Sequence, residues 1–368
     1  MRLASPAPKK ILTLDGGGIR GLIALEVLAA LEQQLAARSS NPDGFVLADY
    51  FDFVAGTSTG AIIAAAIAYG MPVARIQGFY RECGAAMFEP ANWLERFHNK
   101  YRDEAFSQQL QVVFGAGHTL GNAPLRTLLM MVMRNASTDQ AWCVTNNPHA
   151  KFNLDQRHPH LDLPLWRLVR ASAAAPSYFP PESVQVGEHE FIFIDGGISS
   201  YNNPAFRALL TATAAPYGVN WATGEQSLLL VSVGTGTVPH VNRALKRSEL
   251  NLLYDAKELT PSMILSAVHE QDLLCRTFGR CLYGPPIDKE VGDMVGLPAL
   301  GGRSLFSYVR YNADLTAAGL AELGCTGIDP ASVQEMDSVA HLDSLAAVGR
   351  QIARVQLRDE HFFHFPPA

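Results

Sequence analysis

The stretch FDFVAGTSTGAIIAAAIAYG, residues 51–70, places two glycines, two threonines and a serine between two apolar runs. The first run, FDFVAG, predicts a short buried strand. The alanine-rich second run predicts a helix that is apolar on nearly every side, and such a helix lies in the centre of a domain. The turn between the two runs makes Ser58 its most protruding residue.

Two glycines, Gly56 and Gly60, flank Ser58 in the pattern G-x-S-x-G. In a sharp strand-to-helix turn the backbone approaches itself closely, which glycine tolerates best, and the serine oxygen is pushed out above the sheet. That oxygen then lies beside a helix N-terminus, where developing negative charge is stabilised. We interpret Ser58 as a nucleophile. The alternative is a helix-capping role for the serine and threonine oxygens.

An earlier strand, glycine turn and helix are predicted in KKILTLDGGGIRGLIALEVLAALEQQLAARSS, residues 9–40. Two such units at the start of the chain predict an α/β fold with a parallel, doubly wound sheet. Three successive glycines, Gly16, Gly17 and Gly18, leave their amide N–H groups unobstructed, as an oxyanion hole requires. Arg20 adds a cation suited to a lipid phosphate or to charge developing in a transition state.

The same glycine turn also fits a second pattern. Gly16, Gly18 and Gly21 match G-x-G-x-x-G, which is typical of dinucleotide-binding proteins. That pattern expects an acidic residue about 20 positions further on, at the end of the second strand. Asp43 and Asp49 fit poorly, because one lies in the loop NPDG and the other precedes the strand. A dinucleotide-binding oxidoreductase or binding module is therefore the less favoured alternative.

A serine nucleophile needs a base, and the sequence offers an aspartate. Asp195 follows the apolar run FIFI and precedes two glycines, at the end of a predicted buried strand where open α/β sheets build active sites. None of the eleven histidines follows a buried strand in a glycine turn. A free aspartate has a pKa of about 3.9 and is a weak base, which burial would strengthen. We interpret Ser58 and Asp195 as a dyad, against the alternative that Asp-Gly-Gly is an ordinary turn.

The composition is that of a globular protein, with 48% hydrophobic and 17% charged residues among 368. The net charge of −6 argues against a nucleic acid polymer as partner, because that role wants a basic field. The cysteines form an odd, scattered set without zinc-finger spacing, which favours a reducing cytosol and no metal. They are Cys83, Cys143, Cys275, Cys281 and Cys325.

The rest of the chain predicts further elements and no targeting segment. The start, MRLASPAPKK, lacks the apolar stretch of a signal peptide, and the most apolar run, residues 61–69, is too short for a bilayer, which takes about 20 residues. Residues 71–150 are expected to be mostly helical. Leu228–Val233 is expected to be a buried strand, and the chain beyond residue 239 is expected to be helical.

In order and context, the motifs DGGGIRG, GTSTG and DGG resemble those of patatin-like phospholipases, over residues 11–207. The resemblance implies a three-layer fold, with a mostly parallel central sheet, helices on both faces and extra C-terminal helices. It also implies lipid acyl hydrolysis by a Ser–Asp dyad without histidine and without a cofactor. Ser58 would be the nucleophile, Asp195 the base, and Gly16–Gly18 the oxyanion hole with Arg20 beside it.

One further segment, RASAAAPSYFPP at residues 170–181, is similar to the family's segment before the last catalytic strand. Many members have Asp-Gly-Ala where this chain has Asp-Gly-Gly, but alanine and glycine are both small, so we do not interpret the difference as inactivation. We expect residues 11–207 to form the catalytic core. Residues 208–368 are expected to add strand and helices packed on it, and to include a nucleotide-sensing region.

The C-terminal part is similar, more loosely, to the patatin-like effectors of bacterial CBASS antiphage systems. The segments that carry this resemblance are LLLVSVGTGT, QDLLCRTFGRCLYG and SYVRYNADLTAAGLAELG. Those effectors are activated by a cyclic nucleotide and then degrade membrane phospholipid. Arg276, Arg280 and Arg310 are the candidates for binding a cyclic dinucleotide, because arginine forks suit a dianion. Their alternative role is surface charge and ion pairing.

These observations predict a phospholipase that hydrolyses acyl esters of membrane glycerophospholipids and is switched on by a cyclic dinucleotide in antiphage defence. The alternative is a constitutive lipid acyl hydrolase, or an esterase of soluble acyl substrates. The enzyme is expected to be cytoplasmic and homo-oligomeric and to act peripherally at the inner membrane. Phe88, Trp93 and Phe97 are candidates for membrane contact, with core packing as the alternative.

Overall fold

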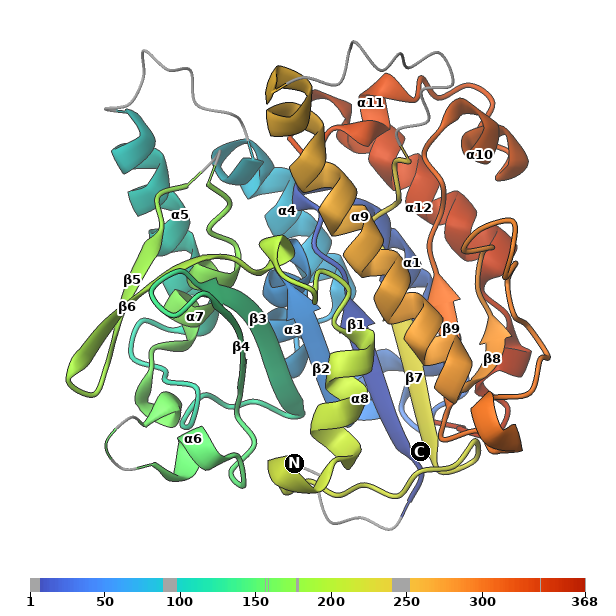
Figure 1. The fold of residues 1–368 in the computed structure, drawn as a ribbon, viewed down its shortest axis with the longest axis horizontal. Coiled ribbons are helices and arrows are strands. Elements are labelled where there is room, and N and C mark those ends of the chain that lie inside the picture. The colour runs from blue at the N-terminus through green and yellow to red at the C-terminus, as the bar shows by residue number, and fades with distance from the viewer. Residues whose placement is uncertain are drawn as a thin grey trace.

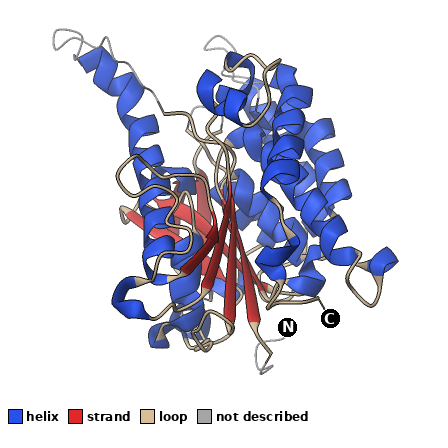
Figure 2. Cartoon of the chain, turned by 90° about the vertical axis from the view of Figure 1, so that its right-hand side faces the viewer, coloured by secondary structure: helices blue, strands red, loops and turns tan. Residues whose placement is uncertain are grey.

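A nine-stranded sheet forms the centre of the molecule, with helices on both faces (Figures 1 and 2). The structure, a computed structural model, describes residues 7–88, 98–155, 157, 159–176, 179–239, 252–337 and 339–367. The strands are β1 (Lys9–Leu14), β2 (Phe53–Thr57), β3 (Leu128–Asn135), β4 (Gln140–Thr145), β5 (Glu182–Val186), β6 (His189–Asp195), β7 (Leu228–Val233), β8 (Arg280–Tyr283) and β9 (Ser307–Tyr311).

The strand order is β5-β6-β3-β2-β1-β7-β9-β8, and β4 pairs with β3 outside this path. The run from β3 to β8 is parallel throughout, whereas β4 and β6 are antiparallel to β3 and β5 is antiparallel to β6. The sheet is therefore mostly parallel, with an antiparallel edge beside β3. The expected three-layer α/β fold is confirmed.

The helices divide between the two faces of the sheet. On the face toward the viewer in Figure 1 lie α8 (Ala205–Thr213) and α9 (Leu252–Phe278). The opposite face is covered by α1 (Gly21–Ala36), α3 (Thr59–Ala68), α4 (Val73–Phe88), α5 (His98–Phe114), α7 (Leu165–Ser172) and α12 (Leu342–Gln356). Shorter helices complete the chain: α2 (Leu47–Tyr50), α6 (Lys151–Leu154), α10 (Ala317–Glu322) and α11 (Ala331–Gln334).

Both faces of the parallel strands are apolar, as expected for a sheet covered on two sides. In β1, Leu12 and Leu14 pack in the cluster shared with α1 and α3, whereas Ile11 packs in the cluster shared with α8 and α9. This alternation follows from the two-residue period of a strand. The helix α3 is buried along its whole length, which confirms its expected place in the centre of the fold.

Two expectations about secondary structure are wrong. Residues 71–150 contain β3 and β4 as well as helices, and the chain beyond residue 239 contributes β8 and β9. The strand β3 reads LLMMVMRN and is buried on both faces, and such a run fits a helix as well as a strand. The strand β9 reads SYVRY and buries its arginine, so its pattern does not resemble that of an apolar strand.

The sheet also runs across the expected division of the chain at residue 208. The strands β7, β9 and β8 lie beyond that point, and β7 pairs directly with β1. A unit made only of residues 11–207 would therefore expose one whole edge of β1. The division into a core and an added part stays a prediction.

Several smaller findings bear on the expected cellular role. The five cysteines are free. Within the described ranges no helix is long and apolar enough to cross a membrane, and no group of histidine, cysteine and acidic side chains could hold a metal ion. Trp93, Phe97 and the side chain of Phe88 lie outside the described residues, so their role stays a prediction.

Truncation of a side chain in α3 should destabilise the whole domain. Ile63 is fully buried, so Ile63→Ala is expected to lower the free energy of unfolding by about 3 kcal/mol through lost burial and a cavity. Val112 in α5 is 78% exposed, and Val112→Ala serves as the control, with a change within about 0.5 kcal/mol. Urea denaturation followed by circular dichroism measures both. Equal losses would contradict the central role of α3.

Candidate active site

The turn between β2 and α3 holds Ser58 in a backbone conformation that serines rarely adopt, with φ 56° and ψ −125°. The flanking glycines make this turn sterically feasible. A Cβ atom on Gly56 would lie 2.0 Å from the carbonyl oxygen of Gly60, and one on Gly60 would lie 2.3 Å from the carbonyl oxygen of Leu14. The pattern G-x-S-x-G therefore has the physical basis expected for a strained, protruding nucleophile.

The side chain of Ser58 contacts Asp195, the last residue of β6. Ser58 Oγ donates a hydrogen bond to Asp195 Oδ2 at 2.5 Å, and the amide of Gly197 donates to Asp195 Oδ1 at 2.6 Å. Both residues of the dyad are buried, with 8% of Ser58 and 5% of Asp195 exposed. The structure thus brings the serine and the carboxylate into direct contact, with the second carboxylate oxygen held by the backbone.

Asp195 lies at the end of its strand, as expected. The strand β6 is antiparallel to β3, with Asp195 opposite Met133. Asp195 therefore does not end a strand of the parallel set. The strand β6 begins beyond the carboxyl end of β3 and runs back along it, so its last residue, Asp195, lies beside the turn that holds Ser58. The sequence did not predict the direction of this strand, which the structure shows to be antiparallel to β3.

The end of α7 and the residues directly after it contact both Ser58 and Asp195. The amide of Ser58 donates to Ser172 Oγ at 3.0 Å, and the Ser172 hydroxyl donates to the carbonyl of Val132 at 2.5 Å. The amide of Asp195 donates to the carbonyl of Ala174 at 2.9 Å. Ser172 and Ala174 were missed as functional residues, although they lie in the segment RASAAAPSYFPP that stood out in the sequence.

The environment of Asp195 makes it a stronger base than a free aspartate. Burial raises the pKa of Asp195 to about 6, although the hydrogen bonds from Ser58 and Gly197 act in the opposite direction. The carboxylate is still ionised at neutral pH and its proton affinity is closer to that of a useful general base. The weakness expected of an aspartate base is thus reduced by desolvation.

The glycine turn after β1 lies against the nucleophile. A Cβ atom on Gly16 would lie 3.3 Å from Ser58 Cβ. The amide of Gly16 donates to the carbonyl of Asn202 at 3.0 Å, so it is occupied. For the amides of Gly17 and Gly18 the described part of the chain supplies no acceptor. The expected oxyanion hole therefore narrows to the amides of Gly17 and Gly18.

Residues from the C-terminal part wall the glycine turn. Thr235 Oγ1 donates to the carbonyl of Gly16 at 2.8 Å. A Cβ atom on Gly17 would lie 2.1 Å from Thr235 Oγ1. Gly18 has φ 61°, and a Cβ atom there would lie 2.2 Å from the carbonyl of Met336. No side chain fits at either glycine, so the turn presents bare backbone.

The expected role of Arg20 as a nearby cation is only partly supported by its placement. Its side chain is buried, and Nη1 donates to the carbonyl of Gln334, the last residue of α11, at 3.2 Å. The guanidinium therefore also fastens the first turn before α1 to the C-terminal part of the chain. A direct role of Arg20 in charge stabilisation stays a prediction.

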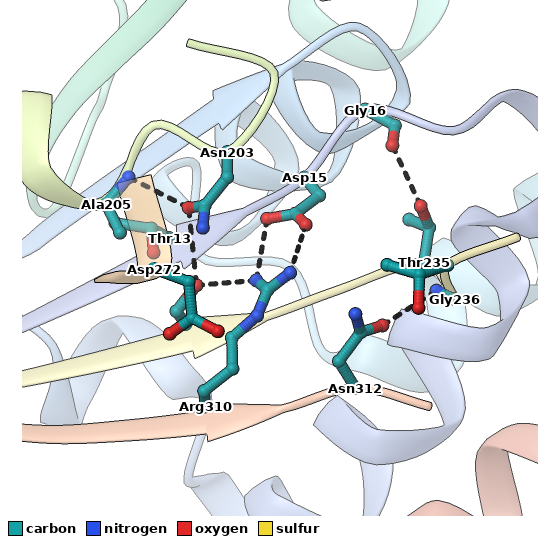
Figure 3. A network of polar contacts seen from close by, with 12 residues as sticks. Thr13, Asp15, Gly16, Asn203, Ala205, Thr235, Gly236, Asp272, Arg310 and Asn312 are labelled. Atoms are coloured by element: carbon teal, nitrogen blue, oxygen red, sulfur yellow. Dashed lines mark hydrogen bonds and ion pairs between the residues drawn. The ribbon is translucent and has the colours of Figure 1, made fainter. Parts of the chain in front are cut away.

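Each of the three arginines expected to bind a cyclic dinucleotide is engaged in an ion pair. Arg276 is buried against Asp272 within α9, at 2.6 Å between Nη2 and Oδ2. Arg310 is buried against Asp15, again as a two-pronged ion pair (Figure 3). Arg280 is half exposed and pairs with Glu225. Two of the three candidates thus form buried ion pairs, and a role of these arginines in binding a nucleotide stays a prediction.

A cavity of about 370 Å³ does lie beside Arg310, between α9, α10, α12 and the end of β9. Its lining includes two carboxylates for which the described residues provide no ion-pair partner, Asp314 and Glu322. Burial lowers the pKa of His269, so this lining side chain is neutral at pH 7. Among the described lining residues the charge without an ion-pair partner is therefore negative, which disfavours a dianionic ligand.

Comparison with known proteins places the chain in a family. A family model described as Patatin-like phospholipase matches residues 12–209, which is 198 of the 368 residues. The chain belongs to the patatin-like phospholipase family. The match ends just after Asp195 and the start of α8, so it contains the dyad and the glycine turn. The competing interpretation as a dinucleotide-binding protein is not supported.

Curated relatives agree with this assignment. Patatin-17 of Solanum cardiophyllum is 32% identical over 267 residues, which cover 67% of this chain and 63% of the relative. Patatin-T5 of Solanum tuberosum is 30% identical with the same coverage. The chain thus spans just under two thirds of the length of these relatives.

Among solved structures, similarity is distant. VipD from Legionella pneumophila is 13% identical with a TM-score of 0.37, covering 95% of this chain and 67% of its own. ExoU of Pseudomonas aeruginosa, solved in a heterodimeric complex with SpcU, is 17% identical with a TM-score of 0.30, covering 73% and 52%.

Replacing Asp195 with asparagine should stabilise the fold in a pH-dependent way. The folded-state pKa of about 6 lies above the ordinary value of 3.8, so the folded protein binds the proton more tightly than the unfolded chain. Stability therefore falls as pH rises from about 4 to 6, by up to about 3 kcal/mol. Asp195→Asn removes this penalty.

Thermal melts at pH 4 and pH 8 measure the effect. The variant is expected to melt above the wild type at pH 8 and to lose this advantage at pH 4. A variant that is less stable than the wild type at pH 8 would show that the buried carboxylate is not held at a cost.

Proposed function

We propose that this chain is a lipid acyl hydrolase in which Ser58 and Asp195 cleave acyl esters of glycerophospholipids. The observation that carries the proposal is the 2.5 Å contact between Ser58 Oγ and Asp195 Oδ2, at a strained turn beside the glycine backbone. Membership of the patatin-like phospholipase family supports the acyl ester as the reacting group.

The dyad supports a two-step reaction. As Ser58 Oγ attacks the ester carbonyl carbon, its proton passes to Asp195, and the carbonyl oxygen becomes an oxyanion. The amides of Gly17 and Gly18 are the proposed donors to that oxyanion. Collapse of the tetrahedral intermediate breaks the ester bond, and the departing alcohol takes the proton from Asp195. An acyl group then remains on Ser58.

Water completes the cycle by the same route. Asp195 removes a proton from a water molecule as its oxygen attacks the acyl carbon. A second tetrahedral intermediate collapses, releases the fatty acid and returns the proton to Ser58 Oγ. Every proton is exchanged through Asp195, so this chemistry requires no histidine and no metal.

Activation by a cyclic dinucleotide and the choice between membrane and soluble substrates are left to experiment. The arginines expected to bind a cyclic dinucleotide are engaged in ion pairs, so they do not support gating by that ligand. The interpretation as an esterase of soluble substrates uses the same dyad. Action at the inner membrane and a homo-oligomeric state stay predictions.

Substitution of the nucleophile should abolish hydrolysis. We expect Ser58→Ala to lower fatty-acid release from mixed phospholipid liposomes by at least about a thousandfold. Ser266→Ala is the control, because Ser266 is an exposed serine on α9 whose hydroxyl donates to the carbonyl of Ser262. A short soluble ester and a panel of cyclic dinucleotides are measured alongside.

The outcomes separate the alternatives. Activity on liposomes without added nucleotide supports a constitutive phospholipase, and activity only with one nucleotide supports gating. Hydrolysis of the soluble ester alone would favour the esterase. If Ser58→Ala retains the wild-type rate, the proposed nucleophile is wrong.

The pH dependence should report the base. Because Asp195 must be ionised to accept the proton and its pKa is about 6, kcat/KM is expected to rise about tenfold per pH unit below 6 and to level off above it. Stopped-flow or pH-stat measurement from pH 4.5 to pH 8 tests this. A profile already flat above pH 4.5 would show that Asp195 is not the base.

A further inference from the structure

The buried pair Asp15–Arg310 joins the catalytic glycine turn to a strand from the end of the chain. Asp15 immediately precedes Gly16 and is 3% exposed, and Arg310 in β9 is 1% exposed. Arg310 Nη1 donates to Asp15 Oδ1 at 2.8 Å and Nη2 donates to Oδ2 at 2.5 Å. Figure 3 shows the guanidinium facing the carboxylate in this two-pronged arrangement.

The two residues are not on neighbouring strands. The strand β7 lies between β1 and β9, and Ser232 of β7 lies opposite both Thr13 of β1 and Arg310 of β9. The small Ser232 side chain leaves room for Arg310 to reach across β7, and it accepts a hydrogen bond from Nη1 at 2.7 Å. The arginine therefore connects three parallel strands at their carboxyl edge.

The same guanidinium is also connected, through Ser232, to the segment that follows Asp195. Ser232 Oγ lies 3.5 Å from Asn203 Oδ1, which accepts the amide of Ala205 at 3.0 Å. The neighbouring residue, Asn202, accepts the amide of Gly16 through its carbonyl. Arg310 thus lies where the glycine turn and the chain after Asp195 come together.

The ion pair is charged and oriented. Burial alone opposes the charged guanidinium, but the Asp15 carboxylate and its hydrogen bonds outweigh this and raise the pKa of Arg310 above its ordinary value. A planar fork bound to both carboxylate oxygens fixes direction as well as distance, which an ammonium cannot do. The glycines that follow Asp15 have no side chains, so the turn depends on such neighbours for its position.

We propose that Arg310 is a positioning residue that holds the oxyanion turn of Gly17 and Gly18 in register with Ser58, acting through Asp15. The inference rests on the proposed function, because it needs a reaction that forms an oxyanion. It does not require that Arg310 touch the substrate.

The experiment compares Arg310→Lys with Arg276→Lys. Both arginines are buried and bind an aspartate in two-pronged fashion. The charge of Asp272 acts on Asp15 and Arg310, but Arg276 donates its hydrogen bonds to Asp272 and to the carbonyl of Asp293 and none to Asp15. Both changes keep the positive charge and remove the fork. Steady-state kinetics on a soluble ester, the rate of Ser58 labelling by a fluorophosphonate and the melting temperature are measured for each variant.

For Arg310→Lys we expect kcat to fall about 10- to 100-fold with KM within about threefold, because displaced oxyanion donors act on the transition state. The rate of fluorophosphonate labelling should fall in parallel, because attack of Ser58 on the reagent also places negative charge on an oxygen atom in the transition state. Arg276→Lys is expected to lower the melting temperature comparably while keeping kcat within about twofold of the wild type.

Four results would contradict the positioning role of Arg310 or the proposed function. An unchanged kcat in folded Arg310→Lys, or an equal loss of kcat in Arg276→Lys, would overturn the positioning role while leaving the hydrolase intact. If Arg310→Lys does not fold, Ser232→Ala removes one hydrogen bond to the same guanidinium, and an unchanged kcat there would overturn the role. An inactive wild type would instead remove the proposed function itself.

Discussion

The contact of Gly60 with the carbonyl of Leu14 is the constraint on which the site depends. A Cβ atom at Gly60 would lie only 2.3 Å from that oxygen, so the two turns that follow β1 and β2 meet backbone to backbone. This closeness brings Ser58, whose backbone is strained, beside Gly16. The geometry of the candidate site therefore depends on the absence of side chains at these glycines, and each glycine has its own steric reason.

The turns and their chemistry were predictable from local sequence, because glycine spacing reports on backbone that few other residues can follow. Ser58, Asp195 and the buried helix α3 could be found in this way. The strands β3 and β9 could not be predicted in this way. The apolar run of β3 fits a helix as well as a strand, and the arginine in β9 gives no sign in the sequence that an ion pair buries it. The roles of Ser172 and Arg310 depend on contacts across 114 and 295 residues, and local pattern carries no information about them.

In the proposed dyad, two features that favour the reaction lower the stability of the fold. Asp195 is held in a dry environment that disfavours its charge, and the hydrogen bond from Ser58 compensates only in part. Ser58 occupies a backbone region that costs free energy. The free energy gained by burying the apolar residues on both faces of the sheet offsets these two costs.

The walls of the glycine turn come from the far end of the chain, and this has a consequence for protein synthesis. Thr235, Arg310 and Met336 all contact the turn or its flanking aspartate. A ribosome adding about 5–20 residues per second exposes Ser58 some tens of seconds before Met336. During that interval the nascent chain carries Ser58 without the residues that wall the glycine turn, so the proposed hydrolase would become competent only after residue 336 has been added.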